Sequence, residues 1–246
     1  MKLGKIFVFL SALSIGGALV VSTLIATRGL VRVKTGDQLT ISVTGSAKRQ
    51  IRSDQILWHA TVSSQADTMT AAYQQLAKQV PVVVQYLVQH GVPTDQITVL
   101  AVDTSQVHPR DKDGQIIPEK VIAYEMTQGI QVRSGHVDKV SEVARSVTEL
   151  INQGISITSS APQYLYTKLG ELKISMLEEA AKDARVRAER IATSTGSKIG
   201  VLRSARMGVI QVNPIGQSEV SDTGVNDTSS LEKEVMTVVA AVFSIE

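Results

Sequence analysis

Seven segments of the chain carry strand signals, and most show the alternation of apolar and polar residues that is typical of half-buried β-strands. In the first, Leu39, Ile41 and Val43 share one face, while serine and threonine side chains occupy the other. The polar residues 46–54 that follow are interpreted as a link. The other predicted strands are residues 56–62, 97–104, 121–133, 155–158, 199–212 and 234–246.

Two of these segments have a well-defined apolar face. In the second strand, the alternation places Ile56, Trp58, Ala60 and Val62 on one side and His59 on the opposite side. In the fourth strand, the residues on one face are Ile122, Tyr124, Met126, Ile130 and Val132. One buried face and one solvated face are typical of antiparallel sheets, so both strands are expected to cover a core.

Three segments show helical signals instead. The first runs from Asp67, a plausible N-cap, to His90, with Gly91 as the stop, and Pro81 predicts a kink or break inside it. The second is an amphipathic helix of residues 137–151. Its apolar positions are Val137, Val140, Val143, Ala144, Val147, Leu150 and Ile151, and Gly154 ends it.

The third helix contains the segment MLEEAAKDARVRAERIATSTGSKIG, residues 176–200, which has a stripe of small side chains. Met176, Ala180, Ala184, Ala188 and Ala192 recur every four residues, and Leu177, Ala181 and Ile191 are expected to widen the stripe. Acid-then-base pairs four residues apart, Glu178 with Lys182 and Asp183 with Arg187, favour a solvated outer face. Gly196 is the expected helix end. The pattern therefore indicates a packing helix rather than a catalytic or nucleic-acid-binding one.

The order of these elements is ββαββα followed by βαββ, which predicts an α+β fold: a mainly antiparallel sheet with helices packed on one face. Two long polar loops interrupt it, residues 106–120 and 213–230. We expect a membrane anchor and basic flank over residues 1–34 and an α+β domain over residues 35–246. An interpretation of that domain as two lobes divides it into residues 35–153 and 154–246.

The N-terminus carries the strongest single signal. Lys2 and Lys5 precede the 21 uncharged residues Ile6 to Ala26, which as a helix span about 31 Å, the thickness of the hydrocarbon core. A cleaved signal peptide is the alternative, but a cut after Ala26 would place Leu24 at a position that prefers a small residue. A retained, single-pass anchor in the cytoplasmic membrane is the favoured interpretation. Flanking charges do not settle orientation, and the short N-terminal flank favours an extracytoplasmic main domain.

Composition narrows the function classes. The net charge of +2 is small for a dedicated nucleic-acid binder, and with 4% aromatic residues a base-stacking platform is not expected. The chain has no cysteine, which excludes disulfides, thiolate metal sites and a cysteine nucleophile. We therefore expect no nucleic-acid partner.

Candidate chemistry is sparse. The four histidines are far apart in the sequence and form no i, i+3 or i, i+4 pair; they are His59, His90, His108 and His136. The segment DKDG, residues 111–114, resembles half of an EF-hand loop, but Pro109 and Lys120 would occupy its first and last ligand positions. No nucleophile elbow, Walker loop or dinucleotide-binding glycine motif is present. The sequence thus predicts no catalytic, cofactor-binding or metal-binding residues, and no enzyme activity.

Three stretches resemble the SIMPL-domain family: ISVTGSA at residues 41–47, VIAYEMTQGIQVRS at 121–134 and EEAAKDARVRAERIATSTGSKIG at 178–200. The resemblance covers roughly residues 38 to 246. It departs at Ala123, where the family usually has glycine before the tyrosine, and at Arg187, near the usual lysine. The resemblance implies a bacterial envelope protein, membrane-anchored or periplasmic, that tends to form homo-oligomers and has a poorly defined biochemical role.

Two functional hypotheses remain. The first is a membrane-anchored, non-catalytic envelope protein that assembles into a homo-oligomer and has a scaffolding or stress-related role. Small residues four apart in the anchor, such as Ala12 and Gly16, and apolar edge strands such as MTVVAAVF support it. The alternative is a ligand-binding sensor or an unrecognised enzyme that uses residues of the two long loops. A polar cluster in a concave pocket would favour the alternative.

Overall fold

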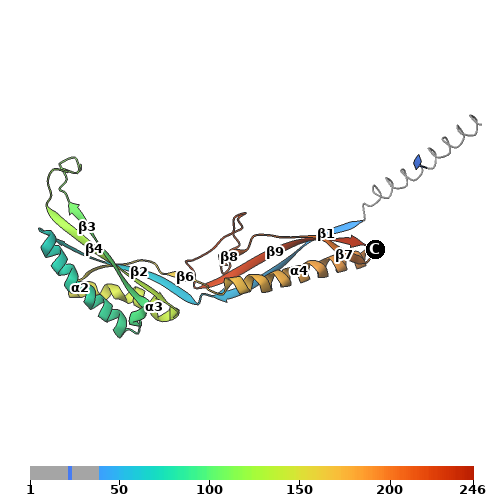
Figure 1. The fold of residues 1–246 in the computed structure, drawn as a ribbon, viewed down its shortest axis with the longest axis horizontal. Helices are drawn as coiled ribbons and strands as arrows, with labels where there is room; N and C mark the ends of the chain where they lie inside the picture. Colours follow the sequence, from blue (N-terminus) through green and yellow to red (C-terminus); the bar gives the residue numbers. More distant parts are fainter. Residues whose placement is uncertain (1–21, 24–38) are drawn as a thin grey trace, which may run out of the picture. The chain divides into compact units, whose positions relative to one another are not determined.

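The computed structural model describes residues 22–23 and 39–246, and its ribbon is shown in Figure 1. It confirms an α+β fold with antiparallel sheets, and three α-helices lie within the described part of the chain. The predicted anchor, Ile6 to Ala26, falls outside the described residues except for Ser22 and Thr23, which are helical and exposed. Among the described helices, none combines the length and the apolarity needed to cross a membrane.

The described chain divides into two compact units, and both are built from separated segments. One unit comprises the described residues up to Ser46 together with Ala180–Met207 and Val239–Glu246. The other comprises Ala47–Glu179 and Gly208–Val238. The boundary predicted between residues 153 and 154 falls inside this second unit. Two strands and a helix contribute residues to both units: β1 (Thr40–Arg52), β9 (Glu232–Ile245) and α4 (Leu169–Ser194).

The larger unit contains a five-stranded antiparallel sheet in the order β3-β4-β2-β5, with β6 also paired to β2. Its strands are β2 (Gln55–Ala66), β3 (Ile97–Val107), β4 (Ala123–Ser134), β5 (Ser156–Ser159) and β6 (Gln163–Leu165). Helices α2 (Met69–Gln89) and α3 (Val137–Ser146) cover one face of β2 and β4 (Figure 1). A 3-10 helix, Val147–Gln153, continues α3, and a short one, Thr94–Gln96, precedes β3.

The core of this sheet lies beneath the two helices. The predicted inward residues of β2, Ile56, Trp58, Ala60 and Val62, are fully buried, which confirms the assigned face. The Trp58 indole N–H donates to the Ser159 hydroxyl at 3.0 Å, so the polar atom of the largest core side chain is satisfied. On β4 the buried apolar residues include Met126, Ile130 and Val132.

A second sheet has the order β1-β9-β7, and β8 pairs with β9. Its strands are β1 (Thr40–Arg52), β7 (Ile199–Met207), β8 (Gln211–Pro214) and β9 (Glu232–Ile245). Strand β1 runs antiparallel to β9, because the Ile245 amide donates to the Leu39 carbonyl and the Ser53 amide donates to the Leu231 carbonyl. Helix α4 (Leu169–Ser194) carries the alanine stripe.

The stripe is buried as predicted. Met176, Ala180, Ala184, Ala188 and Ala192 are at most 1% exposed, and Leu172 extends the row by one more step of four. In the smaller unit, Ala184 and Ala188 pack with Val43 of β1 and with Ala241 and Phe243 of β9. The predicted widening of the stripe was wrong, because Ala181 and Ile191 are exposed and Leu177 is only partly buried. Helix α4 therefore has one narrow row of buried side chains, four residues apart.

The helix boundaries required small corrections. Thr68, not Asp67, is the N-cap of α2, and its hydroxyl accepts a hydrogen bond from the Ala71 amide. No break occurs at Pro81, because α2 stays helical through it. The predicted stops are confirmed: Gly91, Gly154 and Gly196 all have positive φ beyond their helices.

The strand boundaries differ more. Residues 46–52 were predicted as a link but continue β1, and residues 199–212 form two strands separated by a bend rather than one. Strand β6 was not predicted. Ile122 precedes β4 and is exposed, so it does not belong to that strand's apolar face. In each case the residues have weak local signals, and pairing with a neighbouring strand decides the outcome.

Candidate functional site

The best-defined polar site in the larger unit is built around Lys233, the first inward-facing residue of β9. Along β9, alternate residues from position 233 to 243 are buried, so the register directs this lysine into the structure. Its side chain is only 2% exposed. A lysine is almost never this deeply buried unless it is paired, and the Asp227 carboxylate, 7% exposed, supplies the opposite charge at 3.7 Å.

Backbone carbonyl groups complete the surroundings of the lysine. Its ammonium group donates to the Tyr164 carbonyl at 2.9 Å and also to the Asp227 carbonyl. The Asp227 Oδ1 atom accepts from both the amide and the hydroxyl of Ser229, at 2.8 and 2.7 Å. The other carboxylate oxygen, Oδ2, is buried and has no hydrogen-bond partner among the residues that the structure describes.

The environment shifts both titratable groups. Burial lowers the pKa of the Lys233 ammonium group, and attraction to Asp227 offsets only part of this effect. Burial alone would raise the pKa of the Asp227 carboxyl. Hydrogen bonds from Ser229, a contribution from the Ser230 hydroxyl and the charge of Lys233 outweigh burial, so the pKa lies below its usual value of 3.8. Asp227 is therefore an anion at neutral pH.

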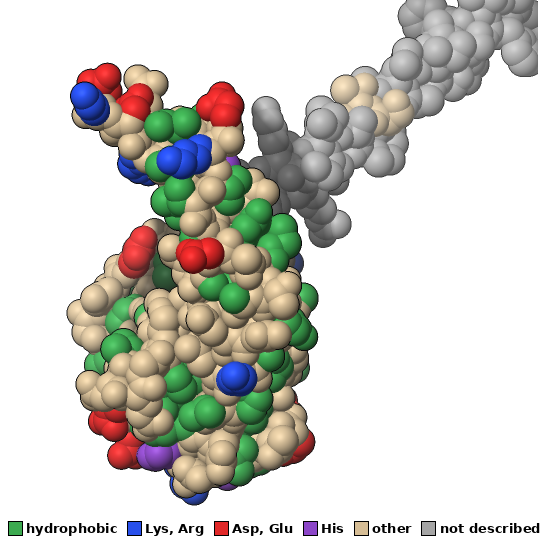
Figure 2. Space-filling view, turned by 90° about the vertical axis from the view of Figure 1, so that its left-hand side faces the viewer, with side chains coloured by type: hydrophobic (Ala, Val, Ile, Leu, Met, Phe, Trp, Pro, Cys, Tyr) green, Lys and Arg blue, Asp and Glu red, His purple; other side chains and the backbone are tan. Residues whose placement is uncertain are grey.

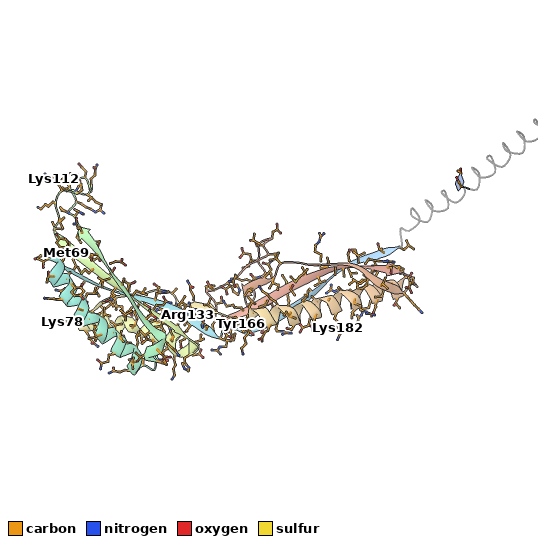
Figure 3. All side chains as sticks on the ribbon, viewed as in Figure 1. Met69, Lys78, Lys112, Arg133, Tyr166 and Lys182 are labelled. Atoms are coloured by element: carbon orange, nitrogen blue, oxygen red, sulfur yellow. The ribbon has the colours of Figure 1, made fainter. Side chains whose placement is uncertain are left out.

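A cavity of about 100 Å³ adjoins this pair. Its apolar walls come from β1, β6, the start of α4 and β8 through Ile51, Leu165, Leu169 and Val212. Two tyrosines, Tyr164 and Tyr166, and the loop residues Asn226 and Thr228 also line it. Figure 3 labels Tyr166 just before α4. The lining of the cavity thus includes apolar side chains and both residues of the charged pair.

Buried amide side chains of β8 hold the loop that carries Asp227. Gln211 accepts from the amides of Ser221 and Val225 and donates to the Ser221 carbonyl, and Asn213 donates to the Glu219 carbonyl. Both amide side chains belong to residues only 3% exposed. The long polar loop predicted at residues 213–230 is therefore pinned to the sheet by specific hydrogen bonds, and it presents Asp227 in a fixed position.

The histidines considered in the sequence are not brought together. His59 lies on β2, partly buried on the face opposite Trp58. His90 stacks on Tyr86 at the end of α2, His108 contacts the Lys120 carbonyl in the hairpin loop, and His136 precedes α3. Within residues 22–23 and 39–246, no group of three or more histidine or acidic side chains could hold a metal ion.

The segment DKDG forms a turn. The Asp111 carboxylate accepts from the amides of Asp113 and Gln115, and Gly114 has a φ of +83°. Charged side chains gather on this loop between β3 and β4, where Figure 3 labels Lys112, and charged side chains are sparser on the surface below it in Figure 2. The Oδ1 atom of Asp111 thus accepts both hydrogen bonds of the turn.

Sequence reasoning missed the Lys233–Asp227 pair. The sequence carries little signal for the burial of Lys233, because the odd-numbered and the even-numbered positions of this strand are both mainly apolar, and Thr237 interrupts the odd-numbered row. The predicted strand began at Glu234, one residue too late to include it. Asp227 has no signal of its own, because it lies in a loop rich in serine and threonine.

Comparisons with known proteins identify a family rather than an activity. A family model described as "SIMPL: Protein of unknown function (DUF541)" matches residues 41–243. No curated protein matches the sequence.

Solved structures resemble the chain only weakly. The regulatory subunit of aspartate kinase from Thermus thermophilus is 12% identical, with 82% of this chain and 88% of that chain covered and a TM-score of 0.21. An aminohydrolase candidate from methicillin-resistant Staphylococcus aureus is 14% identical, and the match covers 58% of this chain and 39% of that one with a TM-score of 0.24. Scores this low carry no argument about this chain.

Proposed function

Because the chain belongs to the SIMPL family, whose function is unknown, we propose a role for it on physical grounds: a membrane-anchored, non-catalytic envelope module that assembles with copies of itself. Its role is scaffolding or stress-related interaction. The observation that carries this proposal is the exposure of β7 at the end of the β1-β9-β7 sheet.

Strand β7 is uncovered, and it carries exposed apolar side chains together with the basic side chains of Arg203 and Arg206. Val201, Leu202 and Met207 are 61%, 53% and 54% exposed, and every residue between positions 201 and 207 is exposed. A terminal strand also presents unpaired backbone amide and carbonyl groups, which favour pairing with another strand. A second copy of the chain supplies a β7 strand of equal length. If two copies paired edge to edge through β7, the unpaired backbone amide and carbonyl groups of both strands would form hydrogen bonds.

The opposite edge of the sheet is protected. In β1 the Ser46 amide donates to the Asp183 carboxylate at 2.8 Å, so a side chain of α4 occupies part of that edge. Arg49 of the same strand pairs with Glu179, and Lys48 pairs with Glu234 at 2.9 Å. A backbone amide that already donates to a side chain cannot pair with an added strand. Association is therefore expected through β7 rather than β1.

Mass photometry and sedimentation of the full chain in detergent test the assembly. We expect oligomers at concentrations up to tens of micromolar, and Leu202→Lys should weaken association at least tenfold by placing a charge on the edge. Val220→Lys is the matched control, because Val220 is 67% exposed but belongs to the loop between β8 and β9 rather than to β7. Monomers alone for the unmodified chain, or equal effects of the two variants, would overturn the proposal.

The anchor is the second part of the proposal. We place Ile6 to Ala26 in the cytoplasmic membrane as a retained single-pass helix, with the main domain outside the cytoplasm. Sequencing the N-terminus of membrane-extracted protein should recover Met1 or Lys2, whereas chains starting near Thr27 would show cleavage. Gly16→Leu should weaken association through the anchor if small residues let two helices approach closely.

A ligand-binding role is the second candidate, and the cavity beside Lys233 and Asp227 is the observation that favours it. Both hypotheses can hold together, since the cavity lies in the larger unit and β7 in the smaller one.

A further inference from the structure

The two units carry net charges of opposite sign. The described residues of the smaller unit include seven basic and three acidic side chains, a net charge of +4. The larger unit includes thirteen basic and nineteen acidic side chains, a net charge of −6 with histidine neutral. The net charge of +2 for the whole chain conceals this difference. The smaller unit therefore attracts an anionic partner, and the larger unit does not.

Four segments meet at one end of the smaller unit: the start of β1, the end of α4, the start of β7 and the end of β9 (Figure 1). Backbone hydrogen bonds hold this end together. The Ile245 amide donates to the Leu39 carbonyl at 2.7 Å, and Lys198 and Glu246 exchange two bonds of 2.9 and 2.8 Å. Because Lys198 lies four residues beyond the last residue of α4, the same end carries the C-terminus of that helix.

This end exposes apolar and basic side chains together. Leu39 is 75% exposed, and Ile191, in the last turn of α4, is 49% exposed. Arg190 and Lys198 are also exposed, and neither forms an ion pair within the part of the chain that the structure describes. Glu246 adds one negative charge. We call Leu39, Arg190, Ile191 and Lys198 the basic end. Binding to a membrane surface strengthens with exposed apolar area and with attraction to anionic lipids, and the basic end offers both.

Chain length keeps the basic end close to the membrane, given the anchor that we propose for Ile6 to Ala26. Only twelve residues, positions 27–38, separate Ala26 from Leu39. Even a fully extended chain of this length reaches at most about 45 Å. A tether that short holds the basic end at a high effective concentration near the lipid headgroups, so a weak attraction is enough for contact.

We propose that the basic end binds the membrane surface, with Arg190 and Lys198 on anionic phospholipid headgroups and Leu39 and Ile191 in the interfacial layer. This contact rests on the proposed anchor, which brings the two together. The acidic larger unit of a second copy is the competing partner for a basic surface. The exposed apolar side chains and the short tether favour the bilayer.

A single label at the basic end tests the contact. The chain has no cysteine, so Ser194→Cys provides one attachment site at the last residue of α4. A fluorescent label there is read in nanodiscs that hold the full chain and lipids spin-labelled at the headgroup. We expect at least threefold stronger quenching with phosphatidylglycerol present than with phosphatidylcholine alone. The difference should vanish in 1 M salt, where the screening length falls from about 10 Å to about 3 Å. Equal quenching in the two lipids would overturn the proposal.

Two charge reversals on α4 locate the contact. Arg190→Glu should remove the quenching that depends on phosphatidylglycerol. Lys182→Glu is the matched control, because Lys182, labelled in Figure 3, is also exposed but lies eight residues earlier, about 12 Å along the helix. It should keep at least half of that quenching, and an equal loss in both variants would contradict the assigned contact. If Arg190→Glu instead lowers the mass of the oligomers and leaves the quenching unchanged, the basic end binds another copy and the proposal fails.

Flotation of the full chain with vesicles separates the surface contact from the anchor. Vesicles of phosphatidylcholine in 1 M salt retain the chain only through its anchor. A chain that floats there but shows no lipid-dependent quenching has the anchor and lacks the surface contact. A chain that does not float there has no anchor. In that case the surface contact stands if the chain floats with phosphatidylglycerol vesicles in about 0.1 M salt, and it is disproved if the chain stays in solution.

Discussion

Gly45 of β1 lies directly against the backbone of Ala184 in α4. A Cβ atom added at Gly45 would lie 2.2 Å from the Ala184 nitrogen and 2.2 Å from the Ala180 carbonyl oxygen. Both neighbours are backbone atoms, so no side-chain rotation can relieve the clash. Gly45 and the alanine row of α4 therefore act together, because the absence of large side chains on both sides lets the backbone of β1 lie against the backbone of α4.

Gly45→Ala should consequently destabilise the protein strongly. Overpacking costs about 1–3 kcal/mol, and we expect at least the upper end because α4 itself must move. Gly170→Ala is the matched control: it lies in the first turn of α4 with nothing near its added Cβ, and it should change stability by less than about 0.5 kcal/mol. Urea unfolding of both variants measures the difference. A neutral Gly45→Ala variant would contradict the close approach.

The buried alanine row gives a second prediction. Ala184→Leu adds three carbon atoms at a fully buried position and should destabilise by about 1–3 kcal/mol. Arg185, one residue later, is exposed and pairs only with Glu189 on its own helix, so Arg185→Ala should change stability by less than about 0.5 kcal/mol. The reverse order in denaturant melts would show that the helix face is assigned wrongly.

Asp183 predicts a dependence of stability on pH. The hydrogen bond from the Ser46 amide, aided by Arg187 and opposed by burial, holds the pKa of this carboxyl below its usual value of 3.8. The depressed pKa means that the ionised carboxylate stabilises the fold above about pH 3.8, and that this contribution is lost as the pH falls through the folded-state pKa.

Asp183→Asn should therefore be less stable than the unmodified chain at pH 7, and the difference should shrink as the pH falls below 3.8. Chemical unfolding at a series of pH values measures this, with Asp222→Asn in the exposed loop as the control. A difference that stays constant down to pH 2 would mean that the charge of Asp183 is not responsible.

Gln211 predicts a local effect on the loop after β8. Gln211→Ala leaves the Ser221 and Val225 amides without their acceptor, and a buried unsatisfied group costs about 1–3 kcal/mol. Hydrogen exchange of residues 215–231 should therefore speed up in this variant. Gln217→Ala, at an exposed position of the same loop, should leave exchange unchanged. Equal exchange in both variants would show that Gln211 does not hold the loop.

The sequence determined the elements with strong local periodicity. Trp58 and its neighbours alternate through a half-buried strand, so their face could be assigned without a structure. The alanines of α4 recur at helical spacing, and Gly91, Gly154 and Gly196 end their helices with positive φ because other residues rarely adopt that conformation. The α+β class follows from these signals and their order.

Tertiary structure decided everything that depends on a distant partner. Residues 46–52 became strand because β9 pairs with β1, although arginine, lysine and glutamine obscure their alternation. The burial of Lys233 could not be predicted from the sequence, because the Asp227 carboxylate that balances its charge lies in a distant loop. Hydrogen bonds from Gln211 and Asn213 of β8 hold that loop in place beside the lysine. The local sequence pattern indicates which face of a strand or helix a residue lies on. The oppositely charged group that pairs with a buried residue such as Lys233 belongs to another segment of the chain, and only the tertiary structure brings the two together.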